Sequence, residues 1–340
     1  MNMIKFDKPV VFLKDIHEIM LSYDLGPVVE AKYLGGVPNV TYRVITPITR
    51  LAVRICNHGY TSIDHLDFEI RLLEFLHSVG FSESPIPIRG KNGKNLQKWR
   101  GYRVVATQLI DGLPGESVEI SNEISFDVGR VISQLQKSFN SFRGEIPRGE
   151  TYIERGERLL NRLPETTSMM GWKIDVDIVI EQWNIACNTI EQSRDRISYG
   201  LIHTDVWPPN ILCKGNKVVG VVDFDDWAYG PTLIDVAAPL VEFPWFYKLD
   251  FDENLAKSFF RGFFANGGVL NSHEKELLIV GMELACASWL SCNALHQIQL
   301  EESEIYLKKL QLLRDNDKRK MLLRKIDNCI TEATKSINLL

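Results

Sequence analysis

The segment LIHTDVWPPNIL, residues 201–212, decides the fold that we expect for this chain. It carries His203, Asp205 and Asn210 in the order H-x-D-x-x-x-x-N, and two consecutive prolines lie between the last two of these side chains. Proline fixes the backbone φ angle, so the loop is stiff. The four intervening residues let the chain reverse, and we therefore expect Asp205 and Asn210 to flank one bound group.

A further carboxylate follows this loop at the end of the strand-like run KVVGVVDF, where Asp223 stands 13 residues after Asn210. A hairpin around Gly215 and Asn216 would bring Asp223 to the same metal ions as Asn210. Both side chains offer the oxygen ligands that Mg²⁺ prefers. Asp205 would then accept or orient the proton of an attacking hydroxyl while metal ions neutralise the phosphates. The alternative is that these residues only form turns, as Asp and Asn often do.

The N-terminal third supplies candidates for holding phosphate. Gly35 and Gly36 separate two predicted strands, and a glycine turn lets the backbone approach phosphates closely, although an ordinary hairpin explains it equally well. Arg54 lies in the strand RLAVRIC, and Glu69 lies in the amphipathic helix predicted over residues 62–80. If strand and helix pack together, Arg54 pairs with Glu69 and contacts the nucleotide phosphates. The alternative is a surface salt bridge.

The order of elements predicts an α+β protein of two parts. Strands dominate up to residue 110, with one long helix among them, and helical patterns dominate after the connector DGLPGES. We predict a small β-rich nucleotide-binding lobe over residues 1–110 and a larger, mainly helical catalytic and substrate-binding lobe over residues 111–340. The helical patterns cover residues 122–140, 176–195, 251–267, 273–298 and 301–337.

Composition excludes several classes of function. The net charge of −5 gives no basic field for nucleic acid. We find no apolar stretch that approaches the roughly 18–20 residues needed to cross a membrane, and charges interrupt the N-terminus where a signal peptide would be apolar. The six cysteines form no CxxC pair and no metal-ligand spacing. We therefore expect a cytoplasmic protein with reduced thiols, without a nucleic-acid or membrane partner.

The segments LIHTDVWPPNIL and GVVDFDDWAYGPTLIDVA resemble the catalytic and metal-binding segments of the aminoglycoside phosphotransferase and choline kinase superfamily. The segments VRICNHGYTSIDHLDFEIRLLEFLHSVGF and ATQLIDGLPGES resemble its N-lobe and hinge. The similarity covers roughly residues 30–300 and is nearest to the branch that contains type II homoserine kinases. It implies the two-lobed protein-kinase-like fold, with ATP and Mg²⁺ as cofactors.

Carried over by position, the resemblance implies that Asp205 is the catalytic base and that Asn210 and Asp223 are the metal ligands. It also implies that Glu69 is the helix partner of the phosphate-contacting Arg54. Many members have lysine at the position of Arg54. Arginine stays charged and can still hold phosphate, but the two side chains are not equivalent.

Two further sites follow from the same resemblance. The hinge backbone at Gln108 and Ile110 would hold adenine. Asp235, in LIDVA, resembles a family carboxylate with a structural rather than a catalytic role.

The acceptor site is expected above Asp205, within the C-terminal helices. Carboxylates and tryptophans there would suit a cationic amine through charge pairing and cation–π contact, although Trp and Glu on helices are more often core and surface residues. The candidates are Asp225, Asp226, Trp227, Glu242, Trp245, Glu283 and Trp289.

These observations predict an ATP- and Mg²⁺-dependent phosphotransferase acting on a small-molecule hydroxyl of an amino alcohol, amino acid, sugar or antibiotic such as an aminoglycoside. One alternative is a serine/threonine protein kinase, which the 11 residues between Asp223 and Asp235 disfavour because they leave no room for a long regulated activation loop. Another is a nucleotide-binding pseudokinase, suggested by Arg54 and opposed by the intact Asp205, Asn210 and Asp223. The acceptor and the oligomeric state stay open.

Overall fold

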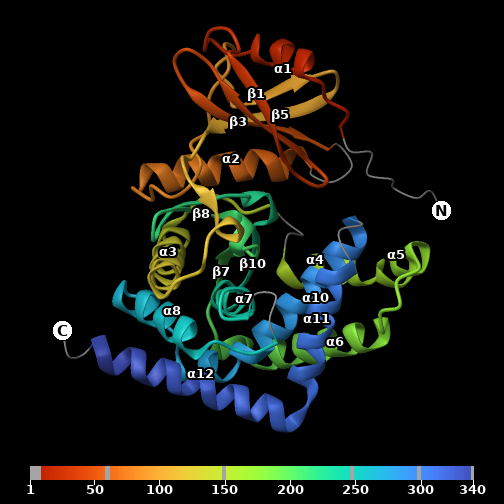
Figure 1. Ribbon diagram of the computed structural model, residues 1–340, viewed down its shortest axis with the longest axis vertical. Coiled ribbons are helices and arrows are strands. Elements are labelled where there is room, and N and C mark those ends of the chain that lie inside the picture. The colour runs from red at the N-terminus through yellow and green to blue at the C-terminus, as the bar shows by residue number, and fades with distance from the viewer. Residues whose placement is uncertain (1–8, 58–61, 148–150, 246–248, 297–299, 338–340) are drawn as a thin grey trace. The chain divides into compact units, whose positions relative to one another are not determined.

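The computed structural model describes residues 9–57, 62–147, 151–245, 249–296 and 300–337 (Figure 1). The chain divides into two structural units. The first contains residues up to Asp111 together with Glu145–Pro147, and the second contains Gly112–Gly144 and the chain from Arg148 onward. A β-sheet builds the first unit and helices build most of the second, so the predicted α+β class is confirmed.

The first unit is an antiparallel five-stranded sheet with the strand order β1-β2-β3-β5-β4 and two helices. Its strands are β1 (Glu30–Gly35), β2 (Val40–Ile45), β3 (Arg50–Cys56), β4 (Leu96–Trp99) and β5 (Tyr102–Gln108), and its helices are α1 (Leu13–Met20) and α2 (Ile63–Ser78). Strand β3 is central, and Arg54 on it lies opposite Thr41 of β2 and Val105 of β5.

The alternation of β3 assigns its side chains to two different cores. Leu51, Val53 and Ile55 are fully buried and pack in a cluster that includes α1. Cys56 faces the other way and packs in a cluster with Leu66 and Ile70 of α2. The two helices therefore cover opposite faces of the sheet, and the face that carries Arg54 is the face of α2 (Figure 1).

In the second unit, helix α10 (Leu278–His296) contacts α6, α7 and α11, and a second group of helices forms where α8 contacts α3 and α12. The other helices are α3 (Asn122–Ser141), α4 (Tyr152–Leu160), α5 (Leu163–Met170), α6 (Val176–Gln192), α7 (Ile234–Glu242), α8 (Glu253–Ala265), α9 (Ser272–Glu276), α11 (Leu300–Arg314) and α12 (Asn316–Ile337). The strands are β6 (Leu113–Pro114), β7 (Tyr199–Ile202), β8 (Ile211–Lys214), β9 (Lys217–Val221) and β10 (Ala228–Pro231).

Helix α10 corrects one expectation. It is long and apolar enough to cross a membrane by length and composition, with 19 residues and a mean hydropathy of 1.5, although we predicted no stretch of this kind. However, 78% of the apolar window is buried inside the second unit. A core helix is apolar on all sides because it is packed on all sides, and α10 has this character.

Candidate active site

Two strand pairs frame the loop that carries Asp205 and Asn210. Strand β7 leads into the loop and pairs with β10, with Ile202 opposite Ala228. Strand β8 leaves the loop and pairs with β9, with Ile211 opposite Val221. The carbonyl of Asn210 extends this second pairing by accepting the N–H of Val222 at 2.9 Å. The loop and the residues after β9 therefore lie side by side, as the predicted hairpin requires.

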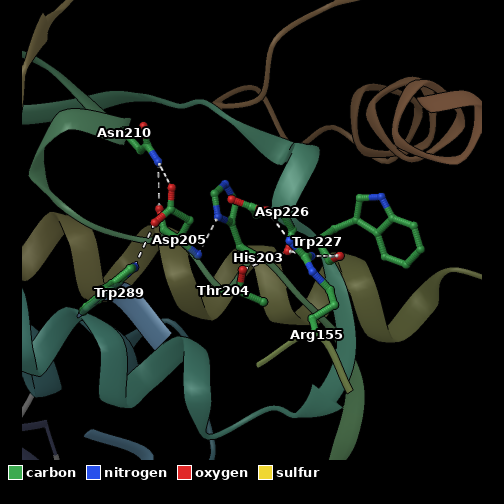
Figure 2. A network of polar contacts seen from close by, with 8 residues as sticks. All are labelled: Arg155, His203, Thr204, Asp205, Asn210, Asp226, Trp227 and Trp289. Atoms are coloured by element: carbon green, nitrogen blue, oxygen red, sulfur yellow. Dashed lines mark hydrogen bonds and ion pairs between the residues drawn. The ribbon is translucent and has the colours of Figure 1, made fainter. Parts of the chain in front are cut away.

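Asp205 is held at both carboxylate oxygens (Figure 2). Asn210 Nδ2 donates to its Oδ2 at 2.6 Å and also to its backbone carbonyl at 3.0 Å. Trp289 Nε1, from α10, donates to Oδ1 at 3.0 Å. The two hydrogen bonds to the carboxylate oxygens fix the plane of the carboxylate, so that its remaining lone pairs have a defined direction.

Burial raises the pKa of Asp205 to about 7, and the nearby negative charge of Asp226 adds to this effect. The hydrogen bonds from Trp289 and Asn210 oppose it by stabilising the charged form. A carboxylate with a pKa in this range is a better proton acceptor than an ordinary aspartate.

Thr204 precedes Asp205 and has a left-handed backbone, with φ +70°, which is unusual for a β-branched residue. Three hydrogen bonds hold it there. Asp235, fully buried at the start of α7, accepts the backbone N–H groups of His203 at 2.8 Å and Thr204 at 2.9 Å. The Thr204 hydroxyl donates to the carbonyl of Asp226 at 2.8 Å. Asp235 thus supports the loop backbone, in keeping with the structural role that the resemblance implies.

His203 lies beneath the loop and is fully buried against the ring of Phe224. Its Nδ1 accepts the backbone N–H of Asp205 at 3.3 Å. Burial lowers the pKa of His203 to about 4, so the imidazole is neutral at ordinary pH. A neutral ring in this position orients the backbone of Asp205 and adds no charge to the loop.

The two predicted metal ligands lie next to the β8–β9 hairpin, where Val222, the neighbour of Asp223, donates its N–H to the carbonyl of Asn210. Because Asn210 directs its amide nitrogen to Asp205, its amide oxygen is left for a metal. Asp223 is exposed, and its left-handed backbone, φ +69°, turns the chain directly after β9. No group of three or more His, Cys, Asp or Glu in the described ranges could hold a metal. Two oxygen ligands still fit Mg²⁺, which commonly takes one or two from the protein and others from phosphates.

Of the predicted acceptor residues, Trp289 is brought directly to Asp205. Asp225 is buried, and Asp226 forms an ion pair with Arg155 of α4. Arg155 also donates to the carbonyls of Asp226 and Trp227 (Figure 2).

Three further candidates have no surface to offer a substrate, contrary to our expectation. Trp227 is fully buried and its ring points away from Asp205 (Figure 2). Glu242 is buried among Tyr306 and Lys309. Trp245 is buried as well, with its ring against Phe251.

Glu283 is also buried and forms an ion pair with Arg319 of α12. The expectation of a direct substrate contact therefore fails for this residue too, because the pair ties α10 to α12.

In the first unit, Arg54 Nη2 lies 2.5 Å from Glu69 Oε2, as predicted, and both side chains are largely buried. The alternative of an exposed surface salt bridge is excluded. Gly35 and Gly36 have positive φ angles, and a Cβ on Gly36 would lie 2.8 Å from the carbonyl of Asn39. The turn therefore needs glycine.

The segment predicted as the hinge follows the end of β5. Gln108 donates its N–H to Ile86, and Leu109 donates to Arg50. Ile110 follows these two residues directly.

Four further residues of the second unit were not expected from the sequence, namely Arg155, Thr204, Tyr306 and Lys309. A capping box of Thr151 and Glu154 marks the start of α4 and was a usable signal for the helix that carries Arg155. The other three depend on tertiary packing, which no local pattern reports.

The chain matches a family model described as "Phosphotransferase enzyme family" over residues 31–272. The homoserine kinase of Beijerinckia indica is 23% identical over 267 residues, which cover 73% of this chain and 75% of that protein. The homoserine kinase of Methylobacillus glycogenes is 26% identical over 216 residues, which cover 63% and 64%.

Solved structures share the fold at low identity. Amicoumacin kinase hAmiN superimposes with a TM-score of 0.69 at 15% identity, covering 93% of this chain and 92% of that chain. A microcompartment-associated aminopropanol kinase gives 0.66 at 16%, covering 93% and 99%. Choline kinase from Cryptosporidium parvum gives 0.66 at 17%, covering 92% and 97%. The fold is thus the two-lobed protein-kinase-like fold, as the resemblance implied. The chain belongs to the phosphotransferase enzyme family and is a small-molecule phosphotransferase with a hydroxyl as its acceptor.

Proposed function

We propose that this chain transfers the γ-phosphoryl group of ATP, with Mg²⁺, to the hydroxyl of a small amino alcohol or hydroxylated amino acid. The observation that carries the proposal is the way in which the carboxylate of Asp205 is held. This carboxylate is fixed by Asn210 and Trp289, and Asn210 is in turn bonded to the backbone beside Asp223. A general base and two oxygen ligands on one stiff hairpin are the parts that phosphoryl transfer needs.

In the acceptor reaction, Asp205 receives a hydrogen bond from the attacking hydroxyl and takes its proton as the bond from that oxygen to the γ-phosphorus forms and the bond from this phosphorus to the bridging oxygen of the departing ADP breaks. Asn210 and Trp289 keep the carboxylate pointing at that hydroxyl. Asn210 and Asp223 would hold Mg²⁺, which when bound neutralises charge on the phosphates. Since phosphoryl transfer passes through a loose transition state, orientation by Asp205 matters more than strong proton abstraction.

We assign the binding of ATP, the phosphoryl donor, to the first unit. Arg54, kept in place by Glu69, would pair with the nucleotide phosphates, and the Gly35–Gly36 turn would let the backbone approach them. The N–H groups of Gln108 and Leu109 are already donated within the unit. The groups proposed for adenine are therefore the carbonyl of Gln108 and the backbone N–H of Ile110.

The proposed chemical class of the acceptor is based on the acceptors for which the relatives are named. The curated matches reported above are homoserine kinases, and two of the structural neighbours are named for aminopropanol and choline. All of these acceptors join a hydroxyl to an amine or ammonium within a few bonds. A neighbour in complex with AMP-PNP and Ca²⁺ supports the use of nucleotide and a divalent cation. Sugars and antibiotics are the competing acceptors.

The test is ADP release from ATP and Mg²⁺ with a panel of acceptors. The panel contains homoserine, serine, aminopropanol, ethanolamine, choline, an aminoglycoside and a protein substrate such as casein. We expect turnover with one small amine and none with casein. Asp205→Asn should lower turnover by about 100-fold or more, while the matched control Asp195→Asn, an exposed aspartate of the same unit, should not lower it. Turnover that survives both EDTA and Asp205→Asn would refute the proposal.

A further inference from the structure

A buried lysine lies behind the proposed acceptor site. Lys309 of α11 is only 1% exposed. Its Nζ donates to the carbonyl of Val241 at 2.9 Å and lies 5.8 Å from the ring centroid of Trp245 and 5.3 Å from that of Tyr306. Together with the adjacent Glu242, these side chains enclose the ammonium, and we call Glu242, Trp245, Tyr306 and Lys309 the ammonium box.

The carboxylate of Glu242 in the box needs a cation close to it. Glu242 is 1% exposed, and its Oε1 has no hydrogen-bond partner in the described parts of the chain. The hydroxyl of Tyr306 hydrogen-bonds to the same carboxylate. A buried carboxylate with one open oxygen is costly unless a positive charge lies close to it, and Lys309 supplies that charge. Aromatic faces on two sides complete a site of the composition that binds alkylammonium ions.

The box is connected to Asp205 through a single pair of rings. Tyr306 packs against Trp289 with ring centroids 5.7 Å apart. Trp289 Nε1 then donates to Asp205 Oδ1 at 3.0 Å. The contacts form a continuous path from Lys309 on α11 through Tyr306 and Trp289 to the catalytic loop.

We propose that Lys309 is a positioning residue for phosphoryl transfer, an internal ammonium that fills an aromatic and acidic box and thereby holds Tyr306, Trp289 and Asp205 in line. The inference rests on the proposed function in one respect, namely that Asp205 faces the acceptor. It also assigns the cation of this box to the chain itself. The amine of an acceptor is therefore recognised elsewhere, and the box cannot serve as its ammonium pocket.

The first experiment removes the charge and keeps the volume. Lys309→Met leaves the carboxylate of Glu242 without its cation, and removing one partner of a buried pair usually lowers stability, so turnover is measured at a temperature at which thermal unfolding shows the variant to be folded. Released from the ammonium, Tyr306 and Trp289 shift. Misplacement on the scale of 1 Å can lower turnover about 100-fold, so we expect kcat to fall roughly 10- to 100-fold. The KM for ATP should change less than about twofold, because the chain of contacts does not include the nucleotide-binding candidates.

Lys308→Ala is the matched control, since Lys308 is the exposed neighbour on the same helix, and it should leave kcat unchanged. ADP release is measured with the best acceptor of the panel, or with water as acceptor if none is turned over. A Lys309→Met variant with wild-type kcat overturns the proposal. So does a KM for ATP that rises in parallel with the loss of kcat, because that result indicates that the nucleotide site is disturbed as well.

The second experiment tests the box without using activity. Lys309→Ala leaves a space shaped like propylammonium. Propylammonium should raise the Tm of Lys309→Ala by several degrees and leave wild type and Lys308→Ala unchanged, and n-propanol at equal concentration should not. Equal effects of the alcohol and the ammonium would mean that only volume matters, and the cation assignment would then be wrong.

The last variant separates this proposal from the proposed function. Trp289→Phe keeps the ring against Tyr306 but removes the N–H that holds Asp205. We expect it to lower kcat as Lys309→Met does, and the double variant to lose less than the product of the two effects. If Asp205→Asn keeps full turnover while propylammonium still binds Lys309→Ala, the proposed function fails and the box stands. If Asp205→Asn is inactive and Trp289→Phe is not, the link from box to base is refuted.

Discussion

At the scale of single residues, the site depends on how completely Asp205 is restrained. A free aspartate on a loop samples several rotamers, and each hydrogen bond that selects one of them reduces the cost of reaching a reactive geometry. Asn210 and Trp289 act on different oxygens of the carboxylate, and the strained Thr204 beside it is held by Asp235. Strain of this kind persists only where the surroundings determine it, and it is concentrated at functional sites.

The first prediction concerns Asp205 itself. Asp205→Asn preserves the size of the side chain and removes the proton acceptor, so the fold and nucleotide binding should persist. Loss of a general base usually lowers kcat by about 10²- to 10⁴-fold. The loose transition state of phosphoryl transfer places the expected loss at the lower end of that range. Steady-state kinetics with a parallel measurement of ATP binding checks it, and near-wild-type turnover would remove Asp205 from the mechanism.

The second prediction concerns the two metal ligands, which should respond differently to excess metal. Asp223→Ala removes a charged ligand, and we expect no turnover at any Mg²⁺ concentration. Asn210→Ala removes a neutral ligand, so high Mg²⁺ or Mn²⁺ should restore part of the activity. The recovery stays partial because Asn210 also holds Asp205. Titration of each variant with both metals measures the difference, and activity that is indifferent to EDTA would contradict the metal assignment.

The contact of Asn210 with Asp205 could be predicted from the sequence, whereas the contact of Trp289 with Asp205 could not. Asn210 stands five residues after its partner on the same loop, so the spacing alone implied that they meet. Trp289 comes from a helix 84 residues further along the chain. It was named only as one of several tryptophans, because its contact with Asp205 depends on how α10 packs.

At the scale of elements, β3 and α2 together place one ion pair. The strand turns Leu51, Val53 and Ile55 into the core beneath α1, so Arg54 must face α2, where Glu69 is buried. The strict period of two along a strand makes such a placement readable from sequence. Strands β7 and β10 and helix α7 were missed because short or uniformly apolar segments have no clear period.

The third prediction tests this ion pair as a unit. A charge-assisted contact with phosphate contributes about 1.5–3 kcal/mol, so Arg54→Ala should raise the Kd for ATP roughly ten- to a hundredfold and leave adenosine binding unchanged. Glu69→Ala should give a smaller loss, and the double variant should lose less than the sum.

Calorimetry with both ligands measures these losses. Arg89→Ala is the matched control. Arg89 forms an exposed ion pair with Glu74, which lies on α2 as Glu69 does. Equal weakening of ATP and adenosine would instead indicate that the first unit has unfolded.

At the scale of the whole molecule, the second unit buries several ionisable side chains almost completely. They are His203, Asp235, Glu242, Glu283 and Lys309. The charge of each must be suppressed or compensated in the folded state. For His203 and Asp235 the pKa differs between the folded and unfolded states, so stability depends on pH through the difference in bound protons between the two states. Burial depresses the pKa of His203 to about 4 and raises that of Asp235 to about 6, so the two groups act in opposite directions between pH 7 and pH 4.

The last prediction isolates the contribution of His203. The unfolded imidazole binds a proton near pH 6.5, whereas the folded one does so only near pH 4. In this window the unfolded state holds more protons, so the contribution of His203 is complete above pH 6.5 and is lost as the pH falls toward 4. The full shift corresponds to about 3 kcal/mol.

His203→Asn keeps an acceptor near the position of Nδ1 for the N–H of Asp205 and removes the titration of the imidazole. Lost ring packing against Phe224 destabilises the variant by an amount that does not depend on pH, and Asp235 remains in both proteins. Urea unfolding at a series of pH values should therefore show that His203→Asn has a lower free energy of unfolding than wild type at pH 7. This gap between the two proteins should close as the pH falls to 4. A gap that stays constant across this range would mean that His203 is not held neutral by the fold.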